Sequence, residues 1–365
     1  MISGFTLARY LARQYLFWFL AFLAVLGGII YLFEVAELTR RTTDLVDVRL
    51  GTILRMGLYK FPNTVETILP FAVLFSSMFS FWRLTRSQEL IIARACGISA
   101  WQFLAPALMV TLFFGLLHIT LLNPLSTIMA VRYQEMETKY LRKGLSLELT
   151  EAGLWLRQEE GGRNYLIHAD QVSLAPLTLH PVLVFIYDRS NTYLGRMDGQ
   201  SAVLDDKKKA WIFSNVWFNW DRQEPFFKDS AKIQTGLTLE QIQDSMASPN
   251  TISIWMLPHF IRALNSIGLP ATRHELKLHA LLAEPVLLCA MIFFAAAFSL
   301  RLSRRGGVLR AMAAGLVTGG LVFAANNVVG ALASAGTLPV FLAAWAIPIT
   351  ALIAGQTTLL YLEDG

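Results

Sequence analysis

Six long apolar segments dominate this sequence, and they fall into two groups of three separated by a less apolar insert. Each segment approaches the roughly 20 residues that an α-helix needs to cross a bilayer. Only 16% of the residues are charged, against about 25% in soluble domains. We therefore predict six transmembrane helices, at about 15–36, 62–82, 100–122, 280–300, 311–334 and 339–362.

Basic residues beside the apolar segments predict their orientation, because Lys and Arg in short flanks favour the cytoplasmic side. Three such flanks would share one face of the membrane. They carry Arg9 and Arg13, then Arg83, Arg86 and Arg94, then Arg301, Arg304, Arg305 and Arg310. Both termini are thus predicted to be cytoplasmic, with residues 123–279 exported. The net charge of +5 is explained by these flanks, so we expect no nucleic-acid partner.

The loop after the first apolar segment does not follow this rule. It carries five basic residues on the predicted outer side, namely Arg40, Arg41, Arg49, Arg55 and Lys60. One interpretation is a solvated loop of mixed charge. The other is a site for an anionic ligand at the outer mouth of the bundle.

The insert differs from its flanks, because its apolar runs are short and alternate with polar residues. Five runs read as strands, at 153–158, 164–173, 181–189, 200–205 and 210–220. No crossover helices lie between them, which favours an antiparallel sandwich or jelly roll. The aromatic residues at 211–220 would fill its core or line a groove for acyl chains. We predict membrane helices in 1–135, the β domain in 136–255, and a connector with further membrane helices in 256–365.

Motifs for nucleotide, metal or nucleophilic chemistry are missing from the sequence. No G-x-x-x-x-G-K-[ST] loop occurs, so any ATP would bind another chain. The histidines show no metal-ligand spacing, and no nucleophile elbow is present. Cys96 and Cys289 suggest no disulfide framework. We expect no enzyme activity, metal or cofactor on this chain.

A few polar residues interrupt the apolar segments. Asn326 and Asn327 would either bond to a neighbouring helix or mark a polar spot on a substrate path. Glu34 and Glu37 would pair with Arg40 or Arg41. His118 and Glu284 complete this set.

The segment SQELIIARACGIS, at 87–99, is too polar to span and lies on the predicted cytoplasmic side. Its pattern predicts a short amphipathic helix that ends at Gly97, with Ser99 capping the next helix. It is either an interfacial turn or a coupling helix that presents Glu89 to a cytoplasmic partner.

The ordered features of the chain resemble the LptF/LptG (YjgP/YjgQ) permease family of the lipopolysaccharide exporter. The matching segments are LARYLARQYL, FEVAELTRR, YKFPNTVETILPFAVLF, RSQELIIARACGIS and EPVLLCAMIFFAAAFSLRLSRRGG. The most specific is R-x-x-E-L-x-x-x-x-x-x-G-x-S, from Arg86 to Ser99. The end of the first apolar segment favours the LptG-like paralogue.

This resemblance implies a six-helix membrane protein with an inserted periplasmic jelly-roll domain. It implies a permease subunit that extracts lipopolysaccharide from the inner membrane, with spans one and five beside a lateral opening. Its partners would be an LptF-like permease, an LptB-like ATPase dimer that holds ATP and Mg, an LptC-like single-span protein and an LptA-like periplasmic bridge. The competing hypotheses are a membrane scaffold or assembly factor whose β domain binds proteins, and a membrane enzyme acting on lipids.

The resemblance also implies site residues. Coupling to the ATPase would involve Arg86, Glu89, Leu90, Gly97 and Ser99. Lipid phosphates would meet Arg40, Arg41 and Arg132, with Glu37 and Tyr31 nearby. Tyr31 stands near a position where family members often have lysine, and Glu37 makes the local charge less favourable for an anion.

Overall fold

The computed structural model describes most of the chain. The described residues are 2–42, 49–140, 146–150, 153–160, 162–174, 177–190, 192–205, 209–220, 224–235, 248–266, 271–302 and 308–364. Two compact units divide the chain. One comprises Met1–Ala130, Ser253–Leu257 and Thr272–Gly365, and the other Val131–Ile252 and Pro258–Ala271. These limits lie near the domain limits predicted above but do not coincide with them.

Among the described residues, six helical stretches are long and apolar enough to cross a membrane, and they confirm the six predicted spans. The helices are α1 (Ile2–Thr42), α2 (Leu50–Arg86), α4 (Ala100–Leu117), which continues through a π turn, η1 (His118–Leu122), into α5 (Asn123–Tyr140), and then α8 (Thr272–Leu302), α9 (Val308–Ser334) and α10 (Val340–Asp364). Most exceed the predicted spans because their polar ends stay helical. Among the basic flanks, Arg304 and Arg305 lie outside the described residues.

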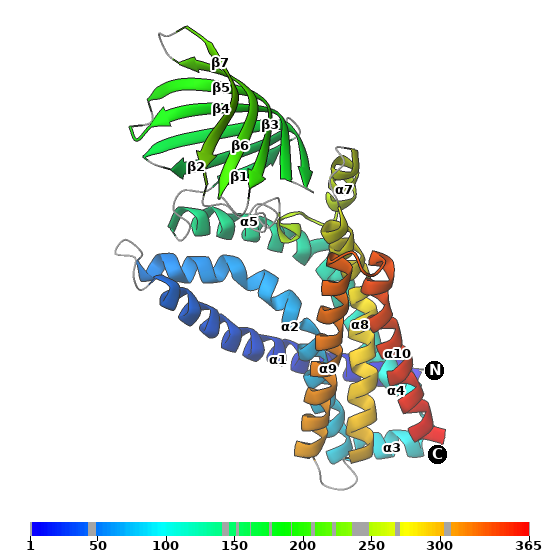
Figure 1. Cartoon of the computed structure of the whole chain (residues 1–365). Coiled ribbons are helices and arrows are strands. Elements are labelled where there is room, and N and C mark those ends of the chain that lie inside the picture. Colours follow the sequence, from blue (N-terminus) through cyan, green and yellow to red (C-terminus); the bar gives the residue numbers. More distant parts are fainter. Residues whose placement is uncertain are drawn as a thin grey trace. The chain divides into compact units, whose positions relative to one another are not determined.

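Helix α8 lies at the centre of the membrane-spanning unit, packed against α10, α2, α4 and α9. Small residues such as Ala290, Ala295 and Ala296 are buried there and let the helices approach closely. Helix α2 is bent in Figure 1, as expected for a helix that contains Pro62 and Pro70. Helices α1 and α9 pack less extensively within the chain, because only 11% of the residues in the most apolar stretch of each are buried. Their apolar faces are left for lipid or another chain.

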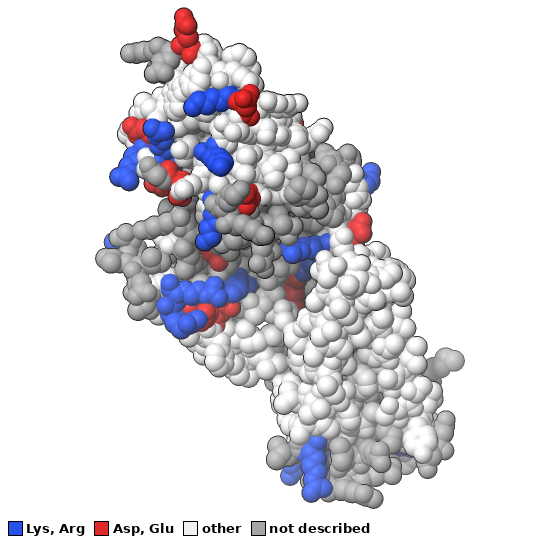
Figure 2. Space-filling view, in the orientation of Figure 1, with Lys and Arg blue, Asp and Glu red and all other residues white. Residues whose placement is uncertain are grey.

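Two short helices flank the spans. Helix α3 (Glu89–Ala95) joins α2 to α4. A 3₁₀ turn, η2 (Pro249–Thr251), and helix α7 (Leu257–Ser266) precede α8. Figure 2 shows a broad surface without charged residues over α8–α10, with Lys and Arg at its lower end. This distribution is typical of a membrane-spanning bundle.

The insert is all-β, as predicted. Its described strands are β1 (Ser146–Thr150), β2 (Gly153–Glu160), β3 (Arg163–Leu174), β4 (Leu177–Asp188), β5 (Tyr193–Asp205), β6 (Ala210–Trp220) and β7 (Phe226–Gln234). They form one antiparallel sheet in the order β1-β2-β3-β4-β5-β6-β7. Each described strand thus pairs with its neighbours in the sequence, an up-and-down order that the sequence alone left open. Few residues separate successive strands in the sequence, which favours antiparallel pairing of neighbours.

The sheet is strongly curved in Figure 1, and its buried apolar side chains form one core cluster. Ile167 pairs with Val184 in the register of β3 and β4, and Ala202 pairs with Phe213 in that of β5 and β6. Trp211 and Phe213 are completely buried. The core interpretation is therefore confirmed for these two aromatic side chains. Trp217, by contrast, is 51% exposed on the other face.

Candidate functional site

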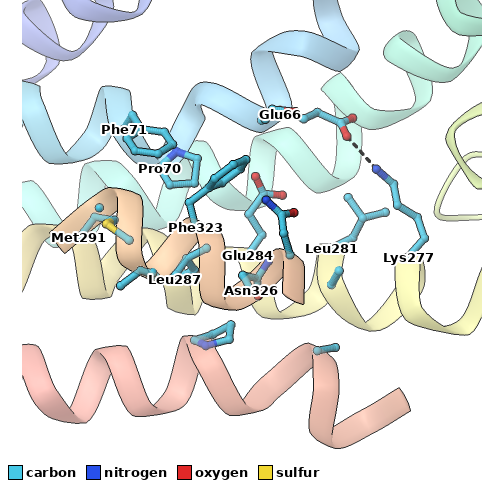
Figure 3. Close-up of a pocket in the computed structure, with 17 residues that line it drawn as sticks. Glu66, Pro70, Phe71, Lys277, Leu281, Glu284, Leu287, Met291, Phe323 and Asn326 are labelled. Atoms are coloured by element: carbon cyan, nitrogen blue, oxygen red, sulfur yellow. Dashed lines mark hydrogen bonds and ion pairs between the residues drawn. The ribbon is translucent and has the colours of Figure 1, made fainter. Parts of the chain in front are cut away.

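A cavity of about 240 Å³ lies inside the membrane-spanning unit, between α2, α8, α9 and α10 (Figure 3). One face of α8 forms a wall from Lys277 through Glu284 to Met291. The spacing fits helical geometry, in which residues three, four or seven apart share a face. The cavity is polar at the Lys277 end and apolar at the Met291 end, where Phe71 and Leu287 also line it. Its volume approaches the lower end of typical small-molecule sites, about 300 Å³.

An ion cluster forms the polar wall. Lys277 Nζ donates to Glu66 Oε2 at 2.9 Å, and Ser126 Oγ donates to Glu66 Oε1 at 2.8 Å. His118 lies between two carboxylates, with Nδ1 2.9 Å from Glu284 Oε2 and Nε2 3.6 Å from Glu66 Oε1. The His118 side chain is only 2% exposed, and that of Glu66 11%. Ionisable groups buried at membrane depth are costly and mark functional positions.

The structure brings together His118 and Glu284, which the sequence showed only as separate polar residues. Asn326 and Asn327 both line the cavity, which favours a polar spot facing an internal space over simple interhelical bonding. Glu66 and Lys277 were not among the residues predicted from the sequence. One signal was available, because Lys277 precedes Glu284 by seven residues, which is two turns on one helix face.

A second charged group lies at the C-terminal end of α1. Glu37 accepts hydrogen bonds from Arg40 Nε and Nη2, both at 2.9 Å, and from Arg41 Nε at 2.8 Å. The predicted pairing of Glu37 is confirmed. The prediction for Glu34 is wrong, because its carboxylate pairs with Lys60 of α2 instead. The Arg40 side chain is 77% exposed, so it remains accessible to an anion.

Tyr31 and Arg132, the other two predicted lipid-site residues, have partners outside the charged group at the end of α1. The Tyr31 hydroxyl donates to the Leu54 carbonyl at 3.1 Å, and its ring meets Phe61 edge-on. Tyr31 therefore holds α1 against α2. Arg132 belongs to the other compact unit, where its guanidinium pairs with Glu135 at 3.1 Å.

The segment 87–99 folds as the sequence predicts. Helix α3 is followed by Gly97 with φ +82°, a left-handed conformation that glycine adopts without strain. Ser99 caps α4, with the Gln102 N–H donating to Ser99 Oγ at 3.3 Å and the Ser99 N–H to the Gln102 side chain at 3.3 Å. Arg86, the last residue of α2, lies over the Trp82 ring.

The surface of α3 is divided. Leu90 is buried against the bundle, whereas Ile91 and Ile92 are 59% and 62% exposed. Glu89 is half-buried and lies beside the Tyr10 hydroxyl. An apolar anchor on one face and exposed isoleucines on the other suit a short helix that docks into a second protein. Across the described residues, no group of three His, Cys, Asp or Glu is placed to hold a metal ion.

Comparison with known proteins identifies the family of this chain. The family model described as "Lipopolysaccharide export system permease LptF/LptG" matches residues 9–361. The chain belongs to this family. The match includes all six spans and the β domain, which makes the chain an inner-membrane protein of permease type.

Three similar proteins are named lipopolysaccharide export system permease protein LptG. Those of Escherichia coli K12 and O6:H1 are each 21% identical over 244 residues, and the chain spans 65% of their length. That of Haemophilus influenzae is 20% identical over 339 residues, with 89% of this chain and 90% of the relative aligned. These names agree with the LptG-like expectation from the sequence.

Proposed function

We propose that this chain is the LptG-like permease subunit of an ATP-driven lipopolysaccharide exporter in the inner membrane. The family match supports the class, and the divided surface of α3 is the observation that carries the mechanism. In this proposal both termini are cytoplasmic and the β domain is periplasmic. ATP and Mg bind an LptB-like ATPase dimer, and an LptF-like permease completes the membrane part.

Helix α3 is the proposed contact for the ATPase. Its exposed isoleucines enter an apolar groove, and Glu89 meets a basic group at the rim. Leu90 keeps α3 attached to the bundle, while the capped start of α4 and the turn at Gly97 fix its direction. Because α3 is fixed in this way, a movement of the ATPase also moves α2 and α4.

Helices α1 and α9 are the proposed borders of the lateral opening. Both leave most of their apolar surface unburied within the chain, as expected for helices that meet the partner permease or incoming acyl chains. Lipid phosphates meet Arg40 and Arg41 at the end of α1, with Arg132 as a further contact. Export follows because ATP-driven closure favours states in which these lipid contacts are weaker.

The β domain receives the lipid and passes it to a periplasmic bridge of LptC-like and LptA-like partners. Among the described strands, β1 and β7 each have one neighbour in the sheet. Such edges can add a strand from another protein. The same edges favour the second candidate function, a scaffold whose β domain binds proteins without moving lipid.

Replacing Glu89 with Lys tests the coupling proposed for α3. In proteoliposomes that contain the chain with its partner permease and ATPase, we expect Glu89→Lys to lose most lipopolysaccharide release. A like-charge contact across an interface disfavours binding strongly. The amount of folded chain should stay unchanged, because Glu89 is half-exposed.

The matched control is Glu159→Lys, the same charge reversal at an exposed strand residue. Normal ATP-driven lipid release from the Glu89→Lys complex would contradict the proposal. Loss of release in both variants would point to a general charge effect.

A further inference from the structure

We propose that Glu66, His118 and Asn123 are positioning residues that anchor the first two chain connections between the units, the outgoing helix α5 and the segment returning at Ser253, so that movements of α2 and α8 reach the β-domain unit. The inference rests on the proposed export function. The three residues all belong to the membrane-spanning unit.

The chain crosses between the two units after Ala130, Ile252, Leu257 and Ala271, and the first two of these four crossings meet at one place in the membrane-spanning unit. The chain leaves this unit after Ala130, in α5, and returns to it at Ser253. On return, the buried N–H of Ile254 donates to Asn123 Oδ1 at 2.9 Å. The Trp255 indole N–H points to the Thr120 carbonyl at 3.4 Å. The returning segment is therefore held on the outgoing helix, directly after the π turn.

The π turn has a physical cause in the sequence. Pro124 has no N–H, and a proline ring clashes with the carbonyl four residues earlier. That carbonyl belongs to Thr120, inside the π turn. Widening the helix relieves this clash and leaves the Thr120 carbonyl available to Trp255. Single π turns occur frequently at functional sites.

Glu66 connects this junction to α2. Its Oε1 accepts from Ser126 Oγ and, at 3.4 Å, from the Asn123 amide. Asn123 therefore contacts Glu66 through its nitrogen and the Ile254 N–H through its oxygen. One side chain joins the second span to the returning segment.

Helix α8 completes the network. Lys277 binds Glu66, and Glu284 meets His118 at the start of the π turn. The buried cluster thus links three spans to these first two connections. Removing one member of such a cluster leaves an uncompensated charge, so its geometry is strongly enforced. Helix α2 ends at Arg86, directly before α3, so a movement at the proposed ATPase contact reaches Glu66 along one helix.

The test compares Asn123→Ala with Ser299→Ala in the complete complex with its partner permease and ATPase. Ser299 Oγ donates to the Met78 carbonyl at 3.2 Å, so the control also removes a buried hydrogen bond between α8 and α2. It lies away from the junction. Three quantities are measured: hydrogen exchange of residues 250–257, ATP hydrolysis, and ATP-dependent photocrosslinking of lipopolysaccharide to a probe at Phe218 in the β domain.

For Asn123→Ala we expect exchange at Ile254 to rise roughly fivefold to tenfold, the factor of one lost hydrogen bond. Crosslinking at Phe218 should fall by a similar factor, while ATP hydrolysis stays within about twofold. Ser299→Ala should leave exchange and crosslinking unchanged. A double variant, Glu66→Gln with Lys277→Gln, keeps the charge balance and should reproduce the loss of crosslinking without loss of folded chain.

The outcomes separate the inference from the function on which it rests. Failure of the unaltered complex to crosslink lipopolysaccharide at Phe218 would count against the proposed function. If the unaltered complex crosslinks and Asn123→Ala does so equally, the inference is wrong. A parallel loss of ATP hydrolysis and crosslinking in Asn123→Ala would show a merely structural role and would also overturn it.

Discussion

At the scale of single residues, Glu37 decides how strongly the end of α1 attracts an anion. Its carboxylate accepts three hydrogen bonds from Arg40 and Arg41, so the group carries one net positive charge rather than two. These side chains are exposed to solvent, where ion pairs contribute little to stability. Substitutions here should therefore change lipid binding and leave the fold intact.

This arrangement predicts opposite effects from neighbouring substitutions. Glu37→Gln removes a negative charge that both guanidinium groups contact and should raise photocrosslinking of lipopolysaccharide near α1. Arg40→Gln with Arg41→Gln should lower it about threefold to tenfold, the range for losing exposed charge-assisted hydrogen bonds. Arg196→Gln, in the β domain, is the control. Equal crosslinking in all variants would show that Arg40 and Arg41 do not contact the lipid.

At the scale of elements, the contact between α9 and α2 depends on glycine. A Cβ at Gly319 would lie 2.8 Å from Leu74 Cδ2 and 3.4 Å from Phe71 Cε1, both on α2. At the neighbouring Gly320 a Cβ would meet nothing within 4 Å. Gly319 therefore permits a close approach of two helices that also border the cavity.

These adjacent glycines form a matched pair of test positions. Both Gly319→Leu and Gly320→Leu gain about 1 kcal/mol of helix propensity, so their difference reports packing. We expect Gly319→Leu to be less stable than Gly320→Leu by roughly 1–3 kcal/mol, the cost of overpacking. Thermal unfolding in detergent measures this difference. Equal stabilities would show that α9 does not pack against α2 as described.

At the scale of the whole molecule, local features were predictable and long-range ones were not. The six spans, the turn at Gly97 and the cap at Ser99 depend on residues close in sequence. The contact of Glu66 with Lys277 joins residues 211 positions apart, and no periodicity encodes such a pair. The partner of Glu34 was not predictable for the same reason, because Lys60 belongs to the next helix. The strand order was left open for another reason: successive strands pair with each other, but alternation within a strand does not show which strand lies beside it.

The central claim is that this chain works as a lipopolysaccharide export permease with an ATPase and a second permease. Purification of the tagged chain from native membranes, followed by identification of associated proteins and lipids, tests it most directly. The account predicts an ATPase, an LptF-like permease and lipopolysaccharide in one complex. Recovery of β-domain-binding proteins without an ATPase or lipopolysaccharide would contradict it and favour the scaffold.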